Sequence, residues 1–314
     1  MKSLKLRIVR KSLYFEYYAY VLAVELRGLG HTVEVCNELS PNRNIVQIIV
    51  GIHEFIPEIK KTLSLNLYGI QTEHLPTASN FAIARGNYNF TQINAVQKNL
   101  AHIFDWIPSN INFHKFRNHS FIPYGLLDLP KKVIQKNPIN KSSPKLVFSG
   151  SVTPRRKDIL ESLKLEFDIT ILKDLWGLDR LLKENQFDAI LNIHADTSPV
   201  FEAPRYWESL AIGVPLITEF SDYTHPFTLD DHFATVILDG PRSIRPALQE
   251  LPILQEKLSN TQKKLSTYNI TFVAYHIVNR IQIENELLKS NKYRIHRKLL
   301  KYVPYFKGIY PSLK

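Results

Sequence analysis

Three charged residues recur at three-residue spacing in the second half of the chain, and their types suit an anionic ligand. Glu202, Arg205 and Glu208 fall on one side of the segment if it is helical. An arginine can hold phosphate oxygens through two parallel hydrogen bonds, and a nearby glutamate can accept hydrogen bonds from sugar hydroxyls. Just upstream, Asn192 and His194 end an apolar run. This combination predicts a nucleotide-phosphate site.

The elements that position these side chains are predicted from the same stretch. Residues 187–194 form an apolar run that predicts a buried parallel strand, whose polar end lies where open α/β sheets bind ligands. Residues 202–212 have helical periodicity, and Gly213 with Pro215 predicts the end of that helix and the start of another strand. Strand and helix therefore deliver polar atoms to one crevice.

A simpler interpretation of these residues stays open. The charges of residues 202–208 can belong to a solvated helix with Glu–Arg pairs, each of which adds only roughly 0.2–0.5 kcal/mol. A histidine at a strand end, such as His194, can serve only to hydrogen-bond the backbone.

The segment resembles the donor-binding core of GT-B glycosyltransferases, which have two Rossmann-like domains facing each other across a cleft. The matching positions are Asn192, Ile193, His194, Phe201, Glu202, Arg205, Glu208, Leu210, Gly213, Pro215, Thr218 and Glu219. The resemblance covers Lys145 to about Tyr275, and the preceding part only as architecture. It implies a nucleotide-sugar donor, with Arg205 on the diphosphate and Glu208 on the ribose or sugar. Many retaining members separate two glutamates by seven residues, whereas Glu202 and Glu208 stand six positions apart, so inversion or retention stays open.

A second phosphate candidate follows the strand predicted at residues 145–150. Gly150 and Ser151 are small enough to let the backbone approach a ligand closely. A helix predicted at residues 157–165 begins beside Arg155 and Arg156, where a helix N-terminus favours an anion. The resemblance implies that this loop lies against the donor and that Arg155 or Arg156 neutralises the departing diphosphate. An exposed arginine pair is the alternative interpretation.

Polar residues also end the strands predicted in the first half of the chain, where a parallel sheet places its site. Glu54 follows the run at 46–50, Glu73 and His74 follow the run at 67–70, and Asp105 follows the run at 101–104. An inverting transfer needs a carboxylate or imidazole near the acceptor hydroxyl, so these four are candidates for the catalytic base. Each can instead hydrogen-bond the local backbone.

The loop after the first strand is a candidate for acceptor contact. The resemblance implies this role for Arg10, Lys11, Tyr14 and Glu16, and solvation of the same residues is the alternative. The loop has no Gly-x-Gly-x-x-Gly, so a nicotinamide enzyme is disfavoured. The chain also has no Asp-x-Asp, which agrees with a metal-independent site; the nucleotide-sugar would be a substrate, and we expect no cofactor.

Short apolar runs alternate with helical segments along the chain, which predicts the α/β class with parallel sheets. With the resemblance, we expect a GT-B fold whose C-terminal helix crosses back to the first domain. The predicted divisions are an acceptor domain at 1–130, a linker at 131–144, a donor domain at 145–275, and a crossover helix with a basic tail at 276–314.

Composition narrows the class of protein. The chain has 314 residues, 44% of them hydrophobic, and a single cysteine that excludes an internal disulfide. Neither a signal-peptide pattern nor a long apolar run is evident, so we expect a leaderless cytoplasmic protein. The formal charge of +11 favours anionic partners, and basic residues concentrate after residue 288 among aromatic ones. That tail is predicted either to pack on the protein or to contact an anionic membrane surface.

These observations lead to one principal function and one alternative. The principal expectation is a glycosyltransferase that moves a hexosyl or related group from a nucleotide-sugar to a hydroxyl of a glycan or lipid-linked glycan, as in polysaccharide biosynthesis. The alternative is a nucleic-acid-binding protein or a DNA-base glycosyltransferase, suggested by the sequence pI of about 9.5 and the basic aromatic tail. A catalytically silent scaffold of the same shape also stays open, because fold does not determine activity.

Overall fold

Each half of the chain forms a parallel sheet, and its central strands are buried on both faces. The computed structural model describes residues 2–42, 44–62, 66–75, 90–114, 118–129, 143–195, 201–221, 224–238 and 240–289. Only the last two residues of the linker predicted at 131–144 are among these, and the basic tail from residue 290 onward lies outside them.

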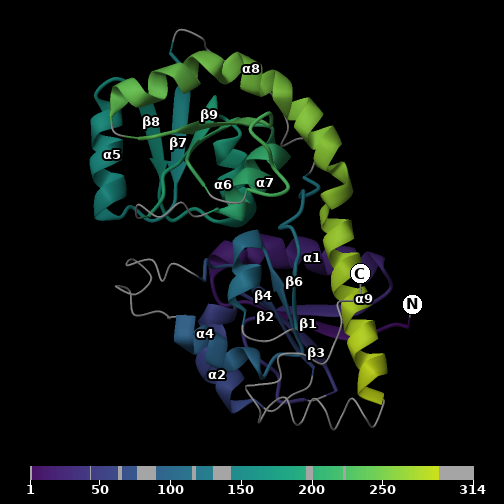
Figure 1. Cartoon of the computed structure of the whole chain (residues 1–314). Helices are drawn as coiled ribbons and strands as arrows, with labels where there is room; N and C mark the ends of the chain where they lie inside the picture. The colour runs from purple at the N-terminus through teal and green to yellow at the C-terminus, as the bar shows by residue number, and fades with distance from the viewer. Residues whose placement is uncertain are drawn as a thin grey trace.

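The first sheet has six parallel strands in the order β2-β1-β3-β4-β5-β6. Its strands are β1 (Lys5–Val9), β2 (Thr32–Cys36), β3 (Val46–Val50), β4 (Leu67–Gln71), β5 (His102–Asp105) and β6 (His119–Phe121). Side chains alternate between the faces: Ile48 and Val50 join the cluster that contains α1 (Glu16–Gly28), whereas Ile49 joins the cluster with α2 (Ile56–Lys61) and α4 (Phe90–Gln97). Helices therefore cover both faces (Figure 1).

The second sheet has five parallel strands in the order β11-β10-β9-β7-β8. Its strands are β7 (Lys145–Ser149), β8 (Asp168–Leu172), β9 (Ala189–Asn192), β10 (Leu216–Glu219) and β11 (Phe233–Val236). One face packs against α5 (Pro154–Lys164) and α8 (Pro241–Leu265), and the other against α7 (Ala203–Ile212). Helix α6 (Gly177–Glu184) joins β8 to β9.

Local sequence signals set the helix ends nearest the ligand edge of the second sheet. The Thr153 side chain accepts a hydrogen bond from the Arg156 backbone at 3.3 Å and caps α5, and Pro154 follows at the first helical position. Gly213 ends α7 with a φ of 74°, in the left-handed region that a glycine adopts without strain. These caps fix the helices that carry Arg156 and Arg205.

The domains share one hydrophobic cluster on one side of their interface. It includes Tyr18 and Leu22 of α1 together with Leu181 of α6 and Trp207 of α7. The aromatic rings of Tyr18, Trp106 and Tyr124 contact one another there, with ring centroids 4.7 to 4.8 Å apart. This burial holds the domains together on the side where α1 meets α6 and α7.

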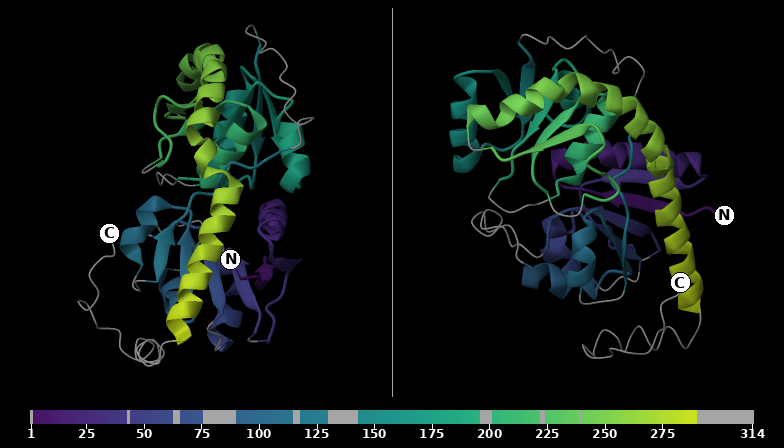
Figure 2. Two further views of the ribbon diagram at one scale, coloured as in Figure 1. Left: turned by 90° about the vertical axis from the view of Figure 1, so that its right-hand side faces the viewer. Right: turned by 45° about the horizontal axis from the view of Figure 1, so that its top comes forward.

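The chain returns to its first domain at the end. After α8 and the short η5 turn (Ser266–Tyr268), helix α9 (Ile270–Lys289) runs down the first domain beside α1 (Figures 1 and 2). Six of its apolar residues are buried, namely Ile270, Val273, Ala274, Ile277, Val278 and Ile281. Thr271 Oγ1 donates to Glu25 of α1 at 2.6 Å, and the Ile270 backbone donates to the Leu126 carbonyl at 3.0 Å. The crossing helix begins at Ile270, earlier than the predicted residue 276.

The strand orders place a topological switch point in each sheet, between β1 and β3 and between β7 and β9. The chain leaves in opposite directions from the two strands at such a point, so the loops part and open a ligand crevice. The predicted fold class, GT-B with two Rossmann-like domains and a C-terminal crossover helix, is confirmed. In the described ranges no helix combines the length and apolar character needed to cross a membrane.

Candidate functional site

A cleft of about 690 Å³ lies between the domains, where the strand-end loops of both sheets meet. Its lining from the first domain includes Ser12, Tyr14, His53, Glu54, Glu73 and His74. Its lining from the second domain includes Gly150, Ser151, Arg156, Lys173, Trp176, Arg180, Glu202 and Arg205. Loops from both switch points border this one cavity, so it is the candidate site.

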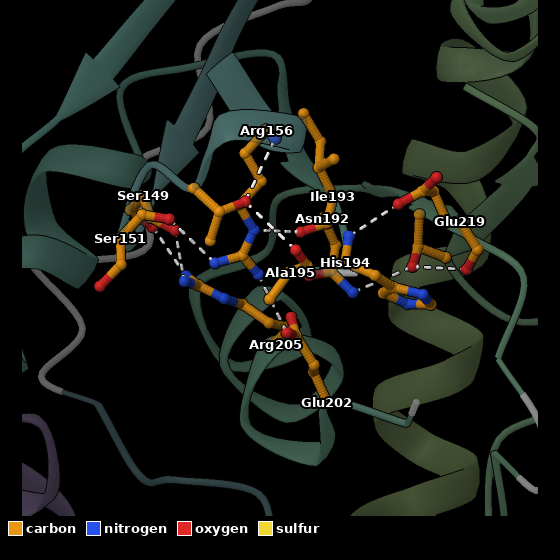
Figure 3. Close-up of polar contacts among 12 residues, drawn as sticks. Ser149, Ser151, Arg156, Asn192, Ile193, His194, Ala195, Glu202, Arg205 and Glu219 are labelled. Carbon is orange, nitrogen blue, oxygen red and sulfur yellow. Dashed lines mark hydrogen bonds and ion pairs between the residues drawn. The ribbon is translucent and has the colours of Figure 1, made fainter. Parts of the chain in front are cut away.

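Arg205 reaches the cleft from the first turn of α7 (Figure 3). Its Nη1 donates to Ser149 Oγ at 2.7 Å, its Nη2 donates to the Ser149 carbonyl, and Glu184 Oε1 lies 3.5 Å from Nη1. Gly150 has a φ of +131°, and a Cβ there would lie 3.0 Å from Arg205 Nη2. The small residue after β7 therefore leaves room for the guanidinium, which the protein itself holds in place.

Arg156 links the two loops that flank the second switch point (Figure 3). Its Nε donates to the Ile193 carbonyl after β9 at 2.7 Å, and its Nη1 donates to the Ser151 carbonyl after β7 at 3.0 Å. Its Nη2 donates to Glu202 Oε1 at 3.1 Å. Burial lowers the pKa of the guanidinium from its ordinary value. Arg156 lines the cleft, and its hydrogen bonds also hold the loops that shape the crevice.

Arg155 and His194 are not among the residues that line the cleft, although both were predicted to face the donor. Arg155 pairs with the Glu219 carboxylate and also donates to the His194 carbonyl at 2.9 Å. Glu219 accepts the His194 backbone N–H at 2.7 Å, and the His194 ring lies 3.3 Å from Ser221 Oγ. Their polar groups join the ends of β9 and β10 instead of facing the cavity.

Glu208 corrects a second expectation, since it lies in the domain interface and does not line the cleft. Its Oε2 accepts a hydrogen bond from Arg180 Nη2 at 2.5 Å, and its Oε1 accepts one from the Tyr124 hydroxyl at 3.0 Å. The reason is backbone geometry: Glu202 is the N-cap before α7, with a φ of −83° and a ψ of 75°, whereas the three helical residues from Arg205 to Glu208 turn the helix by about 300° and so offset the two side chains by about 60°. Glu202 and Arg205 therefore reach the cavity, whereas Glu208 points to the interface.

The arginines around the second switch point are already paired with carboxylates. The pairs are Arg155–Glu219, Arg156–Glu202, Arg180–Glu208 and Arg205–Glu184. Their formal charges cancel, so an anion in the cleft meets oriented N–H donors whose positive charge is already balanced. Such fixed donors can still stabilise a developing negative charge, because they need little reorganisation.

The loop after β1 is held by Glu54, which follows β3. The Glu54 carboxylate accepts the backbone N–H groups of Lys11 at 3.3 Å and Ser12 at 3.1 Å. Lys11 pairs with Glu58 at 2.5 Å. Glu54 lines the cleft, so the structure keeps it as a candidate base with part of its carboxylate in use.

Tyr14 is the member of the predicted acceptor loop that lines the cleft. Arg10 and Glu16 pair with each other at 2.5 Å, and neither they nor Lys11 are among the lining residues.

The other predicted bases differ in whether they line the cleft. Glu73 and His74 line the cleft, and His74 Nε2 lies 3.1 Å from Ser109 Oγ. His53 lines it too, with its Nε2 3.9 Å from Glu73 Oε1. His53 was not selected from the sequence, although it immediately precedes Glu54 in the loop after β3, which was a usable signal.

Asp105 lies in the protein interior, which corrects its selection as a base. The side chain is 0% exposed, and its oxygens accept hydrogen bonds from the Ile107 backbone at 2.8 Å, Asn110 at 3.1 Å and His114 at 2.7 Å. Burial raises the pKa of this carboxyl, and His114 acts in the opposite direction. Asp105 therefore shapes the turn after β5, which is the capping role left open by the sequence.

Sequence reasoning also missed a group from the β8–α6 region. Lys173 and Trp176 follow β8 and line the cleft, and Trp176 is 38% exposed. Arg180 on α6 lines it as well, and its guanidinium lies 5.7 Å from the ring centroid of Tyr14. The sequence signal for this group was the polar and aromatic segment between β8 and α6, at the carboxyl end of an apolar run. Across the described ranges, no cluster of three or more His, Cys, Asp or Glu side chains is arranged to hold a metal ion.

Comparison with solved structures supports the architecture. A putative UDP-N-acetylglucosamine 2-epimerase from Listeria monocytogenes superposes with a TM-score of 0.52 at 11% identity, covering 91% of this chain and 97% of that one. The chain has the GT-B fold. The spinosyn forosaminyltransferase SpnP also matches, with a TM-score of 0.48 at 10% identity over 89% of this chain and 99% of that one.

Sequence comparison adds a distant relative. "Uncharacterized protein L137" of Acanthamoeba polyphaga mimivirus is 27% identical over 172 residues, which are 52% of this chain and 23% of that protein. The chain thus spans about a quarter of the length of the curated relative that it matches. No protein-family model matches the chain.

Proposed function

We propose that this protein is a glycosyltransferase that moves a hexosyl or related group from a nucleotide-sugar to a hydroxyl of a glycan or lipid-linked glycan. The observation that carries the proposal is the cleft lined from both switch points, with Arg205 and Arg156 contributed by the second domain and Glu54, Glu73 and His74 by the first. Side chains suited to phosphate binding and side chains suited to accepting a proton therefore line one cavity, which supports the proposal.

In this proposal the donor diphosphate lies at the β7–β9 crevice. The Arg205 guanidinium and the backbone of Gly150 and Ser151 would hold its oxygens. Arg156 orients the surrounding loops and presents its remaining N–H groups, while Glu202 anchors Arg156. As the bond between the anomeric carbon and the diphosphate breaks, its electron pair goes to the diphosphate, whose negative charge these fixed donors stabilise.

The acceptor hydroxyl would approach from the first domain. Its oxygen forms the new bond to the anomeric carbon, and its proton passes to a base on that wall if the configuration inverts. Glu54, Glu73 and His74 are the candidates that the cleft retains. Replacing the true base, for example in Glu54→Gln or His74→Gln, would lower kcat by roughly 100-fold or more and leave nucleotide binding intact. A variant that lost nucleotide binding as well would point to a structural role.

Three further parts of the proposal concern setting and partners. We propose that transfer needs no metal or other cofactor, that the protein acts in the cytoplasm, and that its product belongs to polysaccharide biosynthesis. The basic tail after residue 288 would bring the enzyme to an anionic membrane surface that carries a lipid-linked acceptor. A nucleic acid is the alternative partner for that tail.

The first experiment is a calorimetric screen of the purified protein against UDP, GDP, ADP, CMP and dTDP, with and without EDTA. We expect saturable binding of one nucleotide that Arg205→Ala weakens by roughly tenfold or more. Arg245→Ala is the matched control, because Arg245 is an exposed arginine paired with Glu166 and does not line the cleft.

Other results would redirect the proposal. If no nucleotide binds while a DNA probe shifts in a salt-sensitive manner, the nucleic-acid alternative replaces it. If a nucleotide binds but the matching nucleotide-sugar is epimerised or hydrolysed without any acceptor, the protein is an enzyme of nucleotide-sugars and not a transferase. A requirement for divalent metal in the EDTA arm would remove the metal-independent part.

A further inference from the structure

Tyr14 extends from the first domain to the charged wall of the second. It lies in the η1 turn (Leu13–Phe15) after β1 and lines the cleft. Its ring is positioned by residues of the other domain: the Trp176 ring meets it edge-on at 6.3 Å between centroids, and the Arg180 guanidinium lies 5.7 Å from its centroid. The ring therefore has a defined place across the domain boundary.

Charged side chains of the second domain influence the pKa of the Tyr14 hydroxyl. Burial raises its pKa above the ordinary value, Glu208 and Glu202 act in the same direction, and Arg205 and Arg180 act against it. The phenol therefore keeps its proton at neutral pH and remains a hydrogen-bond donor. Within the described part of the chain, no side chain or backbone group forms a hydrogen bond with this hydroxyl.

This free donor is notable because the arginines beside it are not free. Arg205 donates to both Ser149 oxygens, and Arg156 donates to two backbone carbonyls and Glu202. A diphosphate at this wall has several oxygens to satisfy, and each one left without a donor in a closed site lowers affinity. Tyr14 is a neutral donor that lines the same cleft as Arg205, and it does so from the first domain.

We propose that Tyr14 is a donor-binding residue: its hydroxyl donates a hydrogen bond to a phosphate oxygen of the nucleoside diphosphate, across from Arg205. This inference rests on the proposed function. It moves Tyr14 from the acceptor contact implied by the family resemblance to the donor, and it makes one donor-binding group depend on the placement of the first domain. Nucleotide binding and the closed domain arrangement therefore favour each other.

The test compares ligands that differ only in their phosphates. Calorimetry measures the affinities of wild type, Tyr14→Phe and Tyr17→Phe for UDP, GDP, ADP and dTDP, each alongside its own nucleoside. Tyr14→Phe removes the hydroxyl and keeps the ring against Trp176 and Arg180. Tyr17→Phe is the matched control, because Tyr17 packs against Gly177 of the second domain and does not line the cleft. Circular dichroism confirms that each variant is folded, and Tyr14→Leu provides a second hydroxyl-free variant.

The expected result is a loss of roughly tenfold or more in the affinity of Tyr14→Phe for the diphosphate that binds wild type. Its affinity for the nucleoside should change less than twofold, and Tyr17→Phe should match wild type for both ligands. Equal diphosphate affinity in Tyr14→Phe and wild type would overturn the inference while leaving the proposed function standing. Parallel losses for nucleoside and diphosphate would also overturn it. If wild type binds no nucleotide, the proposed function fails first.

Discussion

Breaking the buried pair between Arg180 and Glu208 should destabilise the protein far more than breaking an exposed pair of the same geometry. Its N–O distance is 2.5 Å, and the two side chains are 4% and 8% exposed. Arg7 and Glu34 also lie 2.5 Å apart, but their side chains are 21% and 52% exposed. The two pairs therefore have the same N–O distance but differ in the burial of their side chains. Glu208→Gln and Glu34→Gln, each close in shape to glutamate, isolate the effect of burial.

Removing the Glu208 charge leaves Arg180 buried without its nearest partner. Breaking such a pair typically destabilises a protein by about 3–5 kcal/mol. The lower figure is expected here, because Glu184 remains 3.9 Å from Arg180 and glutamine can still accept a hydrogen bond from Tyr124. At roughly 2–4 °C per kcal/mol, a loss of about 3 kcal/mol lowers Tm by roughly 6–12 °C. Glu34→Gln should lose less than about 1 kcal/mol, because solvent screens an exposed pair.

Urea unfolding followed by circular dichroism, with thermal melts beside it, measures both differences. Repeating the experiment in 1 M NaCl sharpens the contrast between the two pairs. At this concentration the Debye screening length is about 3 Å, so salt weakens the interaction of an exposed pair and affects a buried pair much less. The Glu208→Gln effect should therefore persist in salt while the Glu34→Gln effect becomes smaller. Equal losses for the two variants, or a Glu208→Gln effect that salt abolishes, would refute the argument from burial.

Three further predictions concern single positions. Burial lowers the pKa of His232 from 6.5 to about 4. The free energy of unfolding should therefore be fully retained above pH 6.5 and fall as the pH approaches 4, by on the order of 2 kcal/mol at pH 5. Urea unfolding at pH 7 and pH 5 should show this loss in wild type and a smaller loss in His232→Asn. Gly150→Ala should weaken nucleotide binding in calorimetry, because its φ of +131° and the nearby Arg205 oppose a Cβ, whereas Gly28→Ala in α1, with open space around it, should bind normally. Asp105→Ala should lower the free energy of unfolding by roughly 1–3 kcal/mol and leave kcat of the folded protein unchanged; a large fall in kcat would restore it as a base.

The sequence predicted the strands well because each is a short apolar run, and burial on both faces selects such runs. The run predicted at 46–50 has the bounds of β3, and the runs at 67–70 and 101–104 lie within one residue of the bounds of β4 and β5. The short helices α2 and α4 were not predicted, since six and eight residues give little room for helical periodicity. The fold class followed from the order of elements, which depends on no exact boundary.

The candidate site was harder to predict, because type and spacing do not fix where a side chain points. Arg205 and Glu202 reach the cleft, while Glu208, three residues beyond Arg205, points into the domain interface. Asp105 follows a strand as Glu54 does, but its carboxylate accepts hydrogen bonds from Ile107 and Asn110 in the turn after β5. Pairing across domains, such as Arg180 with Tyr14, has no local sequence signal. These outcomes depend on packing between distant segments, which a single sequence does not display.

The returning helix has a consequence for synthesis of the protein. Helix α9 lies at residues 270–289, yet its buried face completes the core of a domain whose strands end at Phe121. The ribosome synthesises the strands of the first domain long before this helix. The apolar face of α1 that packs against α9 therefore stays exposed until the second domain has been synthesised. The first domain therefore reaches its final state last. A chain truncated before Ile270 would contain the strands of both domains but would lack the helix that completes the core of the first domain.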